Sequence, residues 1–167
     1  MKLLLTASAS ALVLAGCASY DGRGLVPGKS AEAEVVATMG TPAETLKRPN
    51  GDKVLFFPRL PVGRETYAAM IGPDGTLRGI DQVLTRDNVN RIAVNSTTRD
   101  QLRSLIGPPY RVVRAAFKPY DVWEYPWHVM EDRRMLWVSL SDDGVVREVV
   151  EIHDFESDPA SGNGKDT

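Results

Sequence analysis

Two stretches of the chain carry apolar residues at the spacing of an amphipathic helix. They are Ala31, Val35 and Met39 in the first stretch, and Leu102, Leu105 and Ile106 in the second. Each pattern stops at a glycine that is followed two residues later by a proline. Glycine suits the left-handed position after a helix and proline cannot continue one, so we expect the helices to end at Gly40 and Gly107.

Polar residues indicate where these helices begin. Ser30 and Thr97 are expected to be their N-caps, with Thr97 and Asp100 forming a variant of the capping box. A further short helix is expected to start after Thr85 and to reach Ala93. Helices of about ten residues are marginal in isolation, so all of them need a surface to pack on.

The rest of the folded part predicts strands separated by tight turns. The turn signals, rich in proline, glycine and aspartate, are residues 49–52 and 73–75 in the first half, and residues 118–121 and 142–144 in the second. The strands expected in the first half are residues 43–48, 53–57, 66–71 and 77–84. Each half therefore predicts an antiparallel meander.

The two halves resemble each other when the chain is set against itself. An offset of 67 residues aligns Met39-Gly40 with Ile106-Gly107, and an offset of 69 aligns Asp74-Gly75 with Asp143-Gly144. Such a drift is what short loop insertions produce, and internal similarity of this kind indicates a duplicated unit.

Together these patterns predict an α+β fold with two tandem units. Each unit is a helix followed by an antiparallel meander, with the helices packed on one face of the sheet. We expect the units at residues 27–84 and 85–155, preceded by a lipidated tether at residues 17–26. Residues 156–167 have almost no apolar side chains and are expected to form a disordered tail.

The beginning of the chain predicts a lipoprotein signal at residues 1–16. After Lys2, an apolar run ends at Leu14, which is too short for a permanent membrane span of about 20 residues and has the layout of a secretory signal. Leu14-Ala15-Gly16-Cys17 matches the bacterial lipobox, at which the cysteine is lipidated and the preceding peptide removed. An ordinary signal peptide with a chance cysteine is the alternative.

Lipidation of Cys17 predicts the location of the protein. Several acyl chains, palmitate among them, hold a folded domain durably on a membrane, because each buried methylene contributes about 0.8 kcal/mol. Ala18 and Ser19 follow the cysteine, and lipoproteins without aspartate there resemble those sent to the outer membrane. We therefore expect the chain at the periplasmic face of that membrane, with the bilayer as its first partner.

Composition narrows the remaining classes of function. The net charge is −2, so the chain lacks the basic surface that binding to nucleic acid requires. One cysteine and two histidines, His128 and His153, leave too few ligands for a zinc site of the usual kinds. We expect no cofactor and no metal, only the covalent lipid on Cys17.

Several short segments resemble a known family. The residues that carry the resemblance are Leu84-Thr85, Asn88, Ile92, Asn95, Ser96-Thr97 and Leu105-Ile106-Gly107-x-Pro109, with a cruder version in Val26-Pro27-Gly28 and Met39-Gly40-x-Pro42. They resemble the SmpA/OmlA (BamE-like) family, which implies a small outer-membrane lipoprotein with a helix-then-hairpin fold that assists the machinery inserting β-barrel proteins. In tandem the fold is similar to the β-lactamase inhibitor proteins, which grip an enzyme with a curved sheet.

Four aromatic residues are the candidates for protein binding. Side chains alternate along a strand, so Trp123, Tyr125 and Trp127 are expected to share one face, with Trp137 beside them from the next strand. Large rigid rings dominate binding hot spots, but the same rings can fill a core. Both interpretations stay open; Trp123 is favoured for the core and Trp127, next to Pro126, for exposure, and the proline indicates a strand that ends or runs along an edge.

Catalytic and metal-binding candidates are weak. His153 and Asp154 could be combined with Ser139 or Ser141 as a hydrolase triad, but no nucleophile-elbow motif supports it. Residues 142–144 resemble a fragment of a calcium loop without its later ligands, and a β-turn accounts for them. We therefore do not expect an enzyme.

The sequence leaves two functions open. The first is a protein-binding accessory or scaffold in the cell envelope, with the β-barrel assembly machinery as a candidate partner. The second is a periplasmic inhibitor that occludes the active site of a hydrolase. An inhibitor predicts a loop that places an acidic or aromatic residue in the partner's cleft, whereas a scaffold predicts contacts that depend on membrane attachment.

Overall fold

The computed structural model describes residue 19 and residues 21–154. The signal peptide, Cys17 and the C-terminal tail lie outside the described residues. The first unit contains α1 (Glu32–Met39), β1 (Glu44–Lys47), β2 (Lys53–Pro58), β3 (Thr66–Ile71) and β4 (Leu77–Gln82). The second contains α2 (Arg86–Asn90), α3 (Arg99–Ile106), β5 (Arg111–Arg114), β6 (Tyr120–Val129), β7 (Asp132–Ser141) and β8 (Val146–His153).

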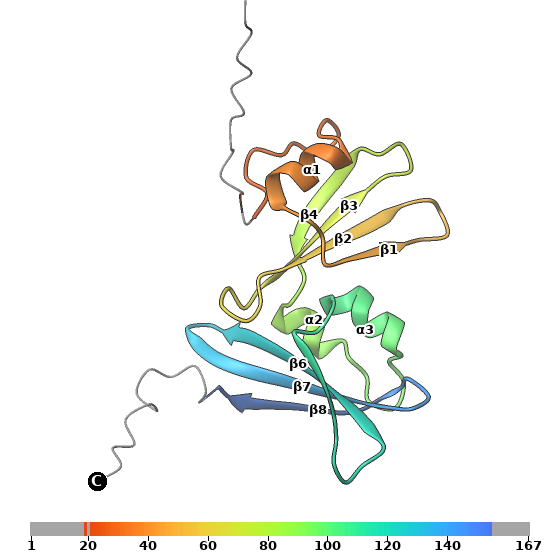
Figure 1. Cartoon of the computed structure of the whole chain (residues 1–167), viewed down its shortest axis with the longest axis vertical. Helices are drawn as coiled ribbons and strands as arrows, with labels where there is room; N and C mark the ends of the chain where they lie inside the picture. Colours follow the sequence, from red (N-terminus) through yellow and green to blue (C-terminus); the bar gives the residue numbers. More distant parts are fainter. Residues whose placement is uncertain (1–18, 20, 155–167) are drawn as a thin grey trace, which may run out of the picture.

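The predicted α+β class and the meanders are confirmed. Strands β1 to β4 form one antiparallel sheet in sequence order, and β5 to β8 form another. A short helix precedes each sheet, and the two sheets are separate rather than continuous. The elements stack as four layers, in the order α1, first sheet, α2 with α3, second sheet (Figure 1).

The packing differs from a simple helix-on-sheet pair, because the first sheet is covered on both faces. One face meets α1 in a core that includes Val35, Met39 and Phe57. The opposite face carries a separate cluster with Val54 and Phe56 and faces the helices of the second unit (Figure 1). The expectation that helices lie on one face of each sheet therefore holds for the second sheet only.

Hydrogen bonds repeat between the units, which supports the duplication inferred from the sequence. The Ser30 hydroxyl accepts a bond from the Val26 N–H at 3.1 Å, and the Thr97 hydroxyl accepts the corresponding bond from Ala93 at 2.8 Å. In each unit the first residue of the last strand donates its backbone N–H to the carbonyl of the equivalent serine or threonine. Leu77 of β4 donates to Ser30 at 2.8 Å, and Val146 of β8 donates to Thr97 at 2.9 Å. Both units also have a register shift near the end of the third strand.

The helix caps lie one residue later than the sequence predicted. Ala31 is the N-cap of α1 and has no side-chain capping bond, and Thr98 is the N-cap of α3 in a full capping box with Gln101. Ser30 and Thr97 are instead used in the preceding turns, where their hydroxyls accept backbone bonds. The predicted ends are confirmed, because both helices stop at glycines with positive φ, 90° at Gly40 and 81° at Gly107.

Polar and steric contacts join the two units. Arg64, in the β2–β3 loop, forms a buried ion pair with Asp154 after β8 and donates to the Arg134 carbonyl at 3.2 Å. Arg103 of α3 lies 3.5 Å from the Glu44 carboxylate of β1. A Cβ on Gly107 would come within 2.7 Å of the Thr66 methyl and 3.2 Å of the Phe56 ring.

Residues 21–26, which the sequence placed in a polar tether, pack against the first unit. The backbone N–H of Ser19 donates to the Thr38 carbonyl at 2.9 Å. Gly22 is buried and Leu25 packs on the first core. Within the described part of the chain, no helix is long and apolar enough to cross a membrane.

Candidate protein-binding surface

Three of the four candidate rings lie in the core of the second unit. Trp123, Tyr125 and Trp127 share the inner face of β6, as their alternation predicted, and all three are buried. The Tyr125 hydroxyl donates to the Gly107 carbonyl at 3.2 Å. Burial raises the pKa of that phenol well above 10. In this fold these rings support the sheet and offer no contact area to a partner.

The expected exposure of Trp127 is wrong. β6 does not end at Pro126, because β7 pairs with it as far as Val129. Beyond Glu124, β6 has no β5 partner, so the missing N–H of Pro126 faces an open edge. On the inner face the guanidinium of Arg86, from α2, stacks 4.6 Å from the centre of the Trp127 ring and covers it.

Trp137 lies on the opposite face of the sheet from the other three rings. The register places it directly across from Glu124, and residues that face each other across a ladder point to the same side. It therefore cannot stand beside Trp123 and Tyr125. Its side chain is 36% exposed, which makes it the candidate ring that a partner can reach.

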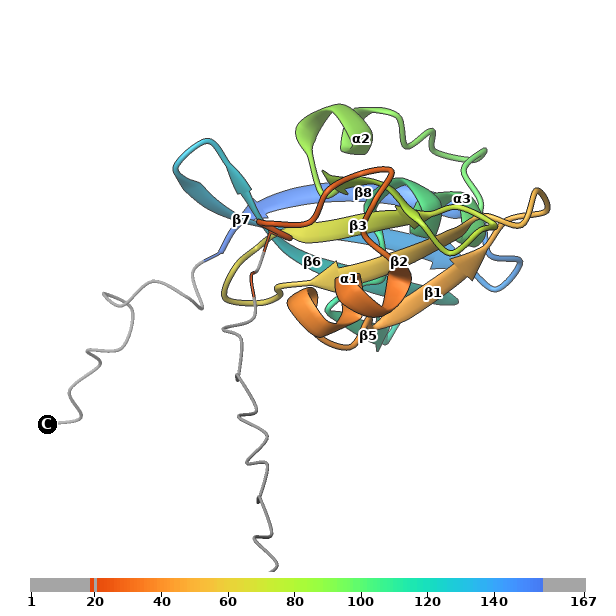
Figure 2. The ribbon, with the colours of Figure 1, turned by 90° about the horizontal axis from the view of Figure 1, so that it is seen from above.

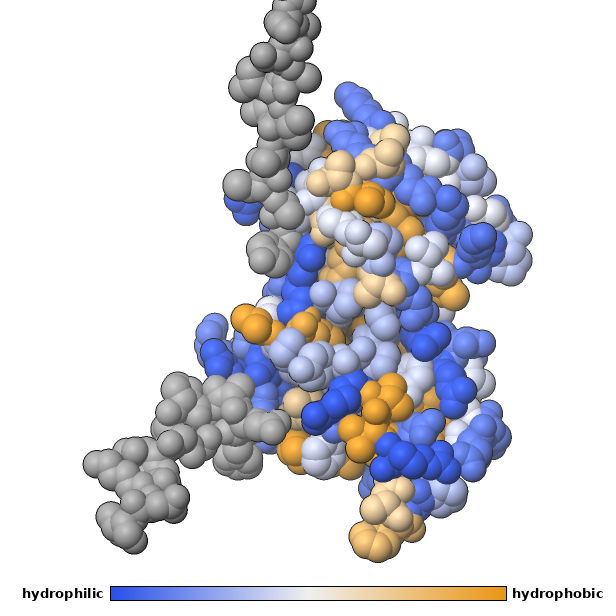
Figure 3. All heavy atoms as spheres, viewed as in Figure 1, coloured by the Kyte–Doolittle hydropathy of each residue, from blue (hydrophilic) through white to orange (hydrophobic). Residues whose placement is uncertain are grey.

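Trp137 stands among apolar side chains on the outer face of the second sheet, which we call the open face. Its apolar members, taken from the strand registers, are Val113, Val122, Met135, Trp137, Val150 and Ile152. All are exposed or half-buried, and no helix of the described chain lies over them. Figure 3 shows apolar atoms on the lowest part of the molecule, over β5 and the turn that follows it.

Ion pairs lie both beside Trp137 and at one end of the open face. Arg111 donates to Glu124 at 2.7 Å, and this carboxylate is largely buried beside Trp137. Lys118 lies 3.6 Å from Glu148 at the other end of the sheet. Apolar side chains interspersed with hydrogen-bonded polar groups are common in protein-binding surfaces.

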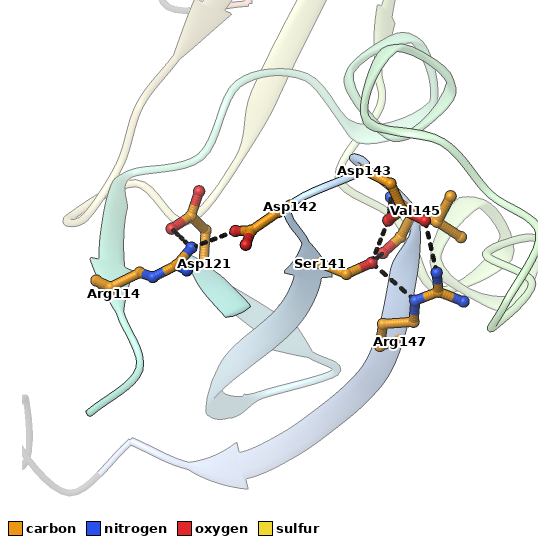
Figure 4. Close-up of polar contacts among 7 residues, drawn as sticks. All are labelled: Arg114, Asp121, Ser141, Asp142, Asp143, Val145 and Arg147. Carbon is orange, nitrogen blue, oxygen red and sulfur yellow. Dashed lines mark hydrogen bonds and ion pairs between the residues drawn. The ribbon is translucent and has the colours of Figure 1, made fainter. Parts of the chain in front are cut away.

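A polar cluster closes the end of the sheet near the β7–β8 turn (Figure 4). Arg114 donates to Asp121 at 3.1 Å and to Asp142 at 2.8 Å. Its hydrogen bond holds the pKa of Asp142 below the ordinary value. The side chains of this cluster pair with one another, so it is a stabilised turn, as the sequence indicated for residues 142–144.

The neighbouring carboxylate belongs to the same turn. Asp143 accepts a hydrogen bond from the Ser141 hydroxyl, which lowers the pKa of the carboxyl, and it pairs with Arg147 at 2.8 Å. Arg147 also donates to the Ser141 oxygen at 2.7 Å (Figure 4). Ser141 is therefore engaged on two sides in holding the turn.

The candidate triad residues do not come together. His153 faces Asp132, with 3.1 Å between Nδ1 and the carboxylate, and Asp154 pairs with Arg64. Ser139 lies opposite Glu148, five residues before His153 on β8, which is about 16 Å along a strand. Within the described residues no group of three histidine, cysteine, aspartate or glutamate side chains could hold a metal ion.

The structure also exposes apolar loop residues that the sequence analysis did not select. Val62 lies in the β2–β3 loop, Phe117 in the β5–β6 turn and Met130 in the β6–β7 turn, with side chains 90%, 100% and 94% exposed. None of the three lies within a turn that the sequence predicted, and no local pattern of residues marks them as exposed.

The comparisons with known proteins add little to this description. No protein-family model and no curated protein matches the chain. Among solved structures, a DUF4309 family protein (YjgB) from Bacillus subtilis aligns with a TM-score of 0.32 and 20% sequence identity, over 79% of this chain and 84% of that one. The SmpA/OmlA resemblance is not shown by any of these comparisons.

Proposed function

We propose that the protein is an outer-membrane lipoprotein, anchored through Cys17, that binds another envelope protein through the open face of its second sheet. In this role it is an accessory or scaffold, akin to the SmpA/OmlA family, with the β-barrel assembly machinery as the first candidate partner. The observation that supports the proposal is the partly exposed apolar stripe centred on Trp137, over which no helix of the described chain lies.

The chemistry of the open face suits a protein partner. Trp137 is rigid and large, and truncation of such residues gives the largest losses of binding energy in protein interfaces. Val150 lies directly across from Trp137 on β8, and Val122 lies on β6 two residues before Glu124, the residue across from Trp137 on that side. Both valines add apolar surface beside the ring. Glu124 next to the ring is paired with Arg111, so a partner can cover it without burying an uncompensated charge.

The experiment is crosslinking in intact cells from one defined position. A photoreactive phenylalanine analogue replaces Trp137 in the full chain, and a second variant carries it at Val26, an exposed position next to the first unit. We expect the Trp137 position alone to yield a crosslinked product that contains a component of the barrel-assembly machinery. Identical products from both positions, or none from Trp137, would contradict binding through the open face.

The anchor needs a separate measurement. Replacing Cys17 by alanine removes the lipidation site, so the folded part is expected to leave the membrane fraction while its circular dichroism stays unchanged. Continued membrane residence of the Cys17→Ala variant would overturn the lipoprotein proposal. The crosslinking result with the natural cysteine would still report on the open face.

A second candidate function, inhibition of a hydrolase, is favoured by Phe117. This ring stands fully exposed at the tip of the β5–β6 turn, where an inhibitor needs a residue that can enter a cleft. The crosslinker at Phe117 distinguishes the candidates. A soluble hydrolase captured from that position, with no product from Trp137, would favour the inhibitor over the scaffold.

A further inference from the structure

The position of the folded body relative to the lipid anchor is tightly limited. Cys17 precedes Ser19 by two residues, and the Ser19 N–H is bonded to the Thr38 carbonyl of α1. Two extended residues span at most about 7 Å. A lipid on Cys17 therefore brings the bilayer surface directly against the end of the molecule where Ser19 lies.

Two loops project at that same end. Figures 1 and 2, which view the molecule from directions 90° apart, both place the β2–β3 loop and the β6–β7 turn on the side where the described chain begins. The end of β8 lies there as well. The β5–β6 turn, in contrast, points away from this end in Figure 1.

Both loops present an apolar side chain to solvent. Val62 is 90% exposed and Met130 is 94% exposed. The β2–β3 loop lies beside the beginning of β7, because Pro61, Val62 and Arg64 line one groove of about 180 Å³ together with Arg133 of β7. Arg64 also ties its loop to the second unit through the Arg134 carbonyl. The two tips therefore project from one firmly held end of the molecule.

We infer that Val62 and Met130 insert into the interfacial region of the bilayer that holds the lipid on Cys17. Apolar tips at the anchored end gain from burial among acyl chains, and confinement by the anchor removes most of the cost of bringing them there. The exposed Arg133 stands next to the tips, where its guanidinium can reach phosphate while its stem stays apolar. This inference rests on the proposed anchor but not on the proposed partner.

The contact would fix the orientation of the whole chain. The strands β2 and β3 of the first sheet and β6, β7 and β8 of the second each have one end on the side that carries the two tips (Figure 1). With that end on the bilayer, the strands stand upright and the open face looks sideways along the membrane. A partner embedded in the same membrane could then reach Trp137 without crossing the depth of the periplasm.

The test measures the depth of each loop with a fluorophore. The full chain, purified in detergent and reconstituted into phosphatidylcholine vesicles, carries an environment-sensitive dye on one introduced cysteine: Val62→Cys, Met130→Cys or, as the matched control, Phe117→Cys. The natural cysteine becomes a thioether on lipidation, so each variant has one reactive thiol. A nitroxide-labelled lipid in the vesicles quenches dyes that enter the bilayer.

We expect a blue shift and loss of fluorescence by lipid quenching at positions 62 and 130, and neither change at position 117. Vesicle-bound protein with all three dyes in water would overturn the inference while leaving the anchor intact. A blue shift at 62 and 130 without lipid quenching would also overturn it, because protein and not lipid would then cover the tips. Failure of every variant to float with vesicles would instead overturn the anchor and the inference with it.

Discussion

The two sheets of this protein are built alike and covered differently. Phe56 and Ala68 face each other across β2 and β3, and the equivalent positions of the second sheet are held by Glu124 and Trp137. The first pair lies beneath the helices of the second unit, and the ring of Phe56 lies close to Gly107 at the end of α3. No helix within residues 21–154 lies over the second pair. The two similar sheets therefore differ in how many of their faces the described helices cover.

The side chains at these equivalent positions match their surroundings. Ala68 is small and lets a helix approach the first sheet, whereas Trp137 is large and partly covers the second sheet itself. Glu124 is acceptable at a position equivalent to the buried Phe56 because Arg111 pairs with it. The comparison teaches that the open face is not an unfinished core but a surface with an apolar centre and paired charges.

The largest expected effect comes from truncating one ring on each of these two faces. Phe56→Ala should lower the free energy of unfolding by about 3–5 kcal/mol, since it removes a fully buried ring. Trp137→Ala should lower it by about 1 kcal/mol, because that ring is already partly in water. Urea unfolding followed by circular dichroism measures both. Equal losses would mean that the open face is covered in solution, which would remove the difference between the sheets.

A loss of similar size is expected from breaking the buried ion pair between the units. Asp154→Asn leaves the Arg64 guanidinium buried without its carboxylate partner and should cost about 3–5 kcal/mol. The matched control is Asp74→Asn, which weakens the exposed Asp74–Arg78 pair and should leave the free energy of unfolding nearly unchanged. The same urea titration compares them. A small effect at Asp154 would show that the units are held together mainly by their apolar contacts.

A smaller difference is expected between the two equivalent helix-ending glycines. Both combine a positive φ with a ψ of −171° or −173°, a region that essentially only glycine occupies, so Gly40→Ala and Gly107→Ala share a backbone strain of about 1–3 kcal/mol. A Cβ at Gly40 meets nothing within 4 Å, whereas one at Gly107 collides with Thr66 and Phe56 of the first unit. Gly107→Ala should therefore cost about 1–3 kcal/mol more. Thermal melts that show equal losses would argue against close packing of the units.

The smallest effect concerns alkaline pH in the first unit. Burial, together with a hydrogen bond to Glu65, raises the pKa of Tyr67 from 10.0 to about 12. The folded state therefore keeps this proton longer than the unfolded state, so stability contributed by Tyr67 is complete below pH 10 and is lost as the pH rises toward 12. Urea midpoints measured over this range should fall less steeply for Tyr67→Phe. Identical slopes for both proteins would contradict the raised pKa.

Much of the fold could be predicted from the sequence because the signals are local. Helix ends at Gly40 and Gly107, the β-turns and the alternation of Trp123, Tyr125 and Trp127 each depend on a few neighbouring residues. Their errors are local as well. The N-cap of α3 is Thr98 and not Thr97. Either of the two adjacent threonines could cap the helix, but the hydroxyl of Thr97 accepts a hydrogen bond from Ala93 in the preceding turn.

The candidate surface was predicted less well because it depends on pairing over distance. The alternation of side chains along a strand predicts that Trp123, Tyr125 and Trp127 share a face. It does not indicate whether helices or water cover that face. The register between β6 and β7 decides that Trp137 stands across from Glu124 and so on the other side. A shift of one residue would have reversed this placement.

The sequence by itself determined two similar helix-and-meander units, their turns and the Cys17 motif, because chain stiffness, capping and residue spacing act within a few residues. Only the tertiary structure decided that the helices of the second unit cover the first sheet, that Trp127 is buried under Arg86, and that Val62 and Met130 project at the end where the described chain begins. These outcomes depend on how the layers stack. Stacking is set by the combined burial of surfaces far apart in the chain, which no short stretch of residues records.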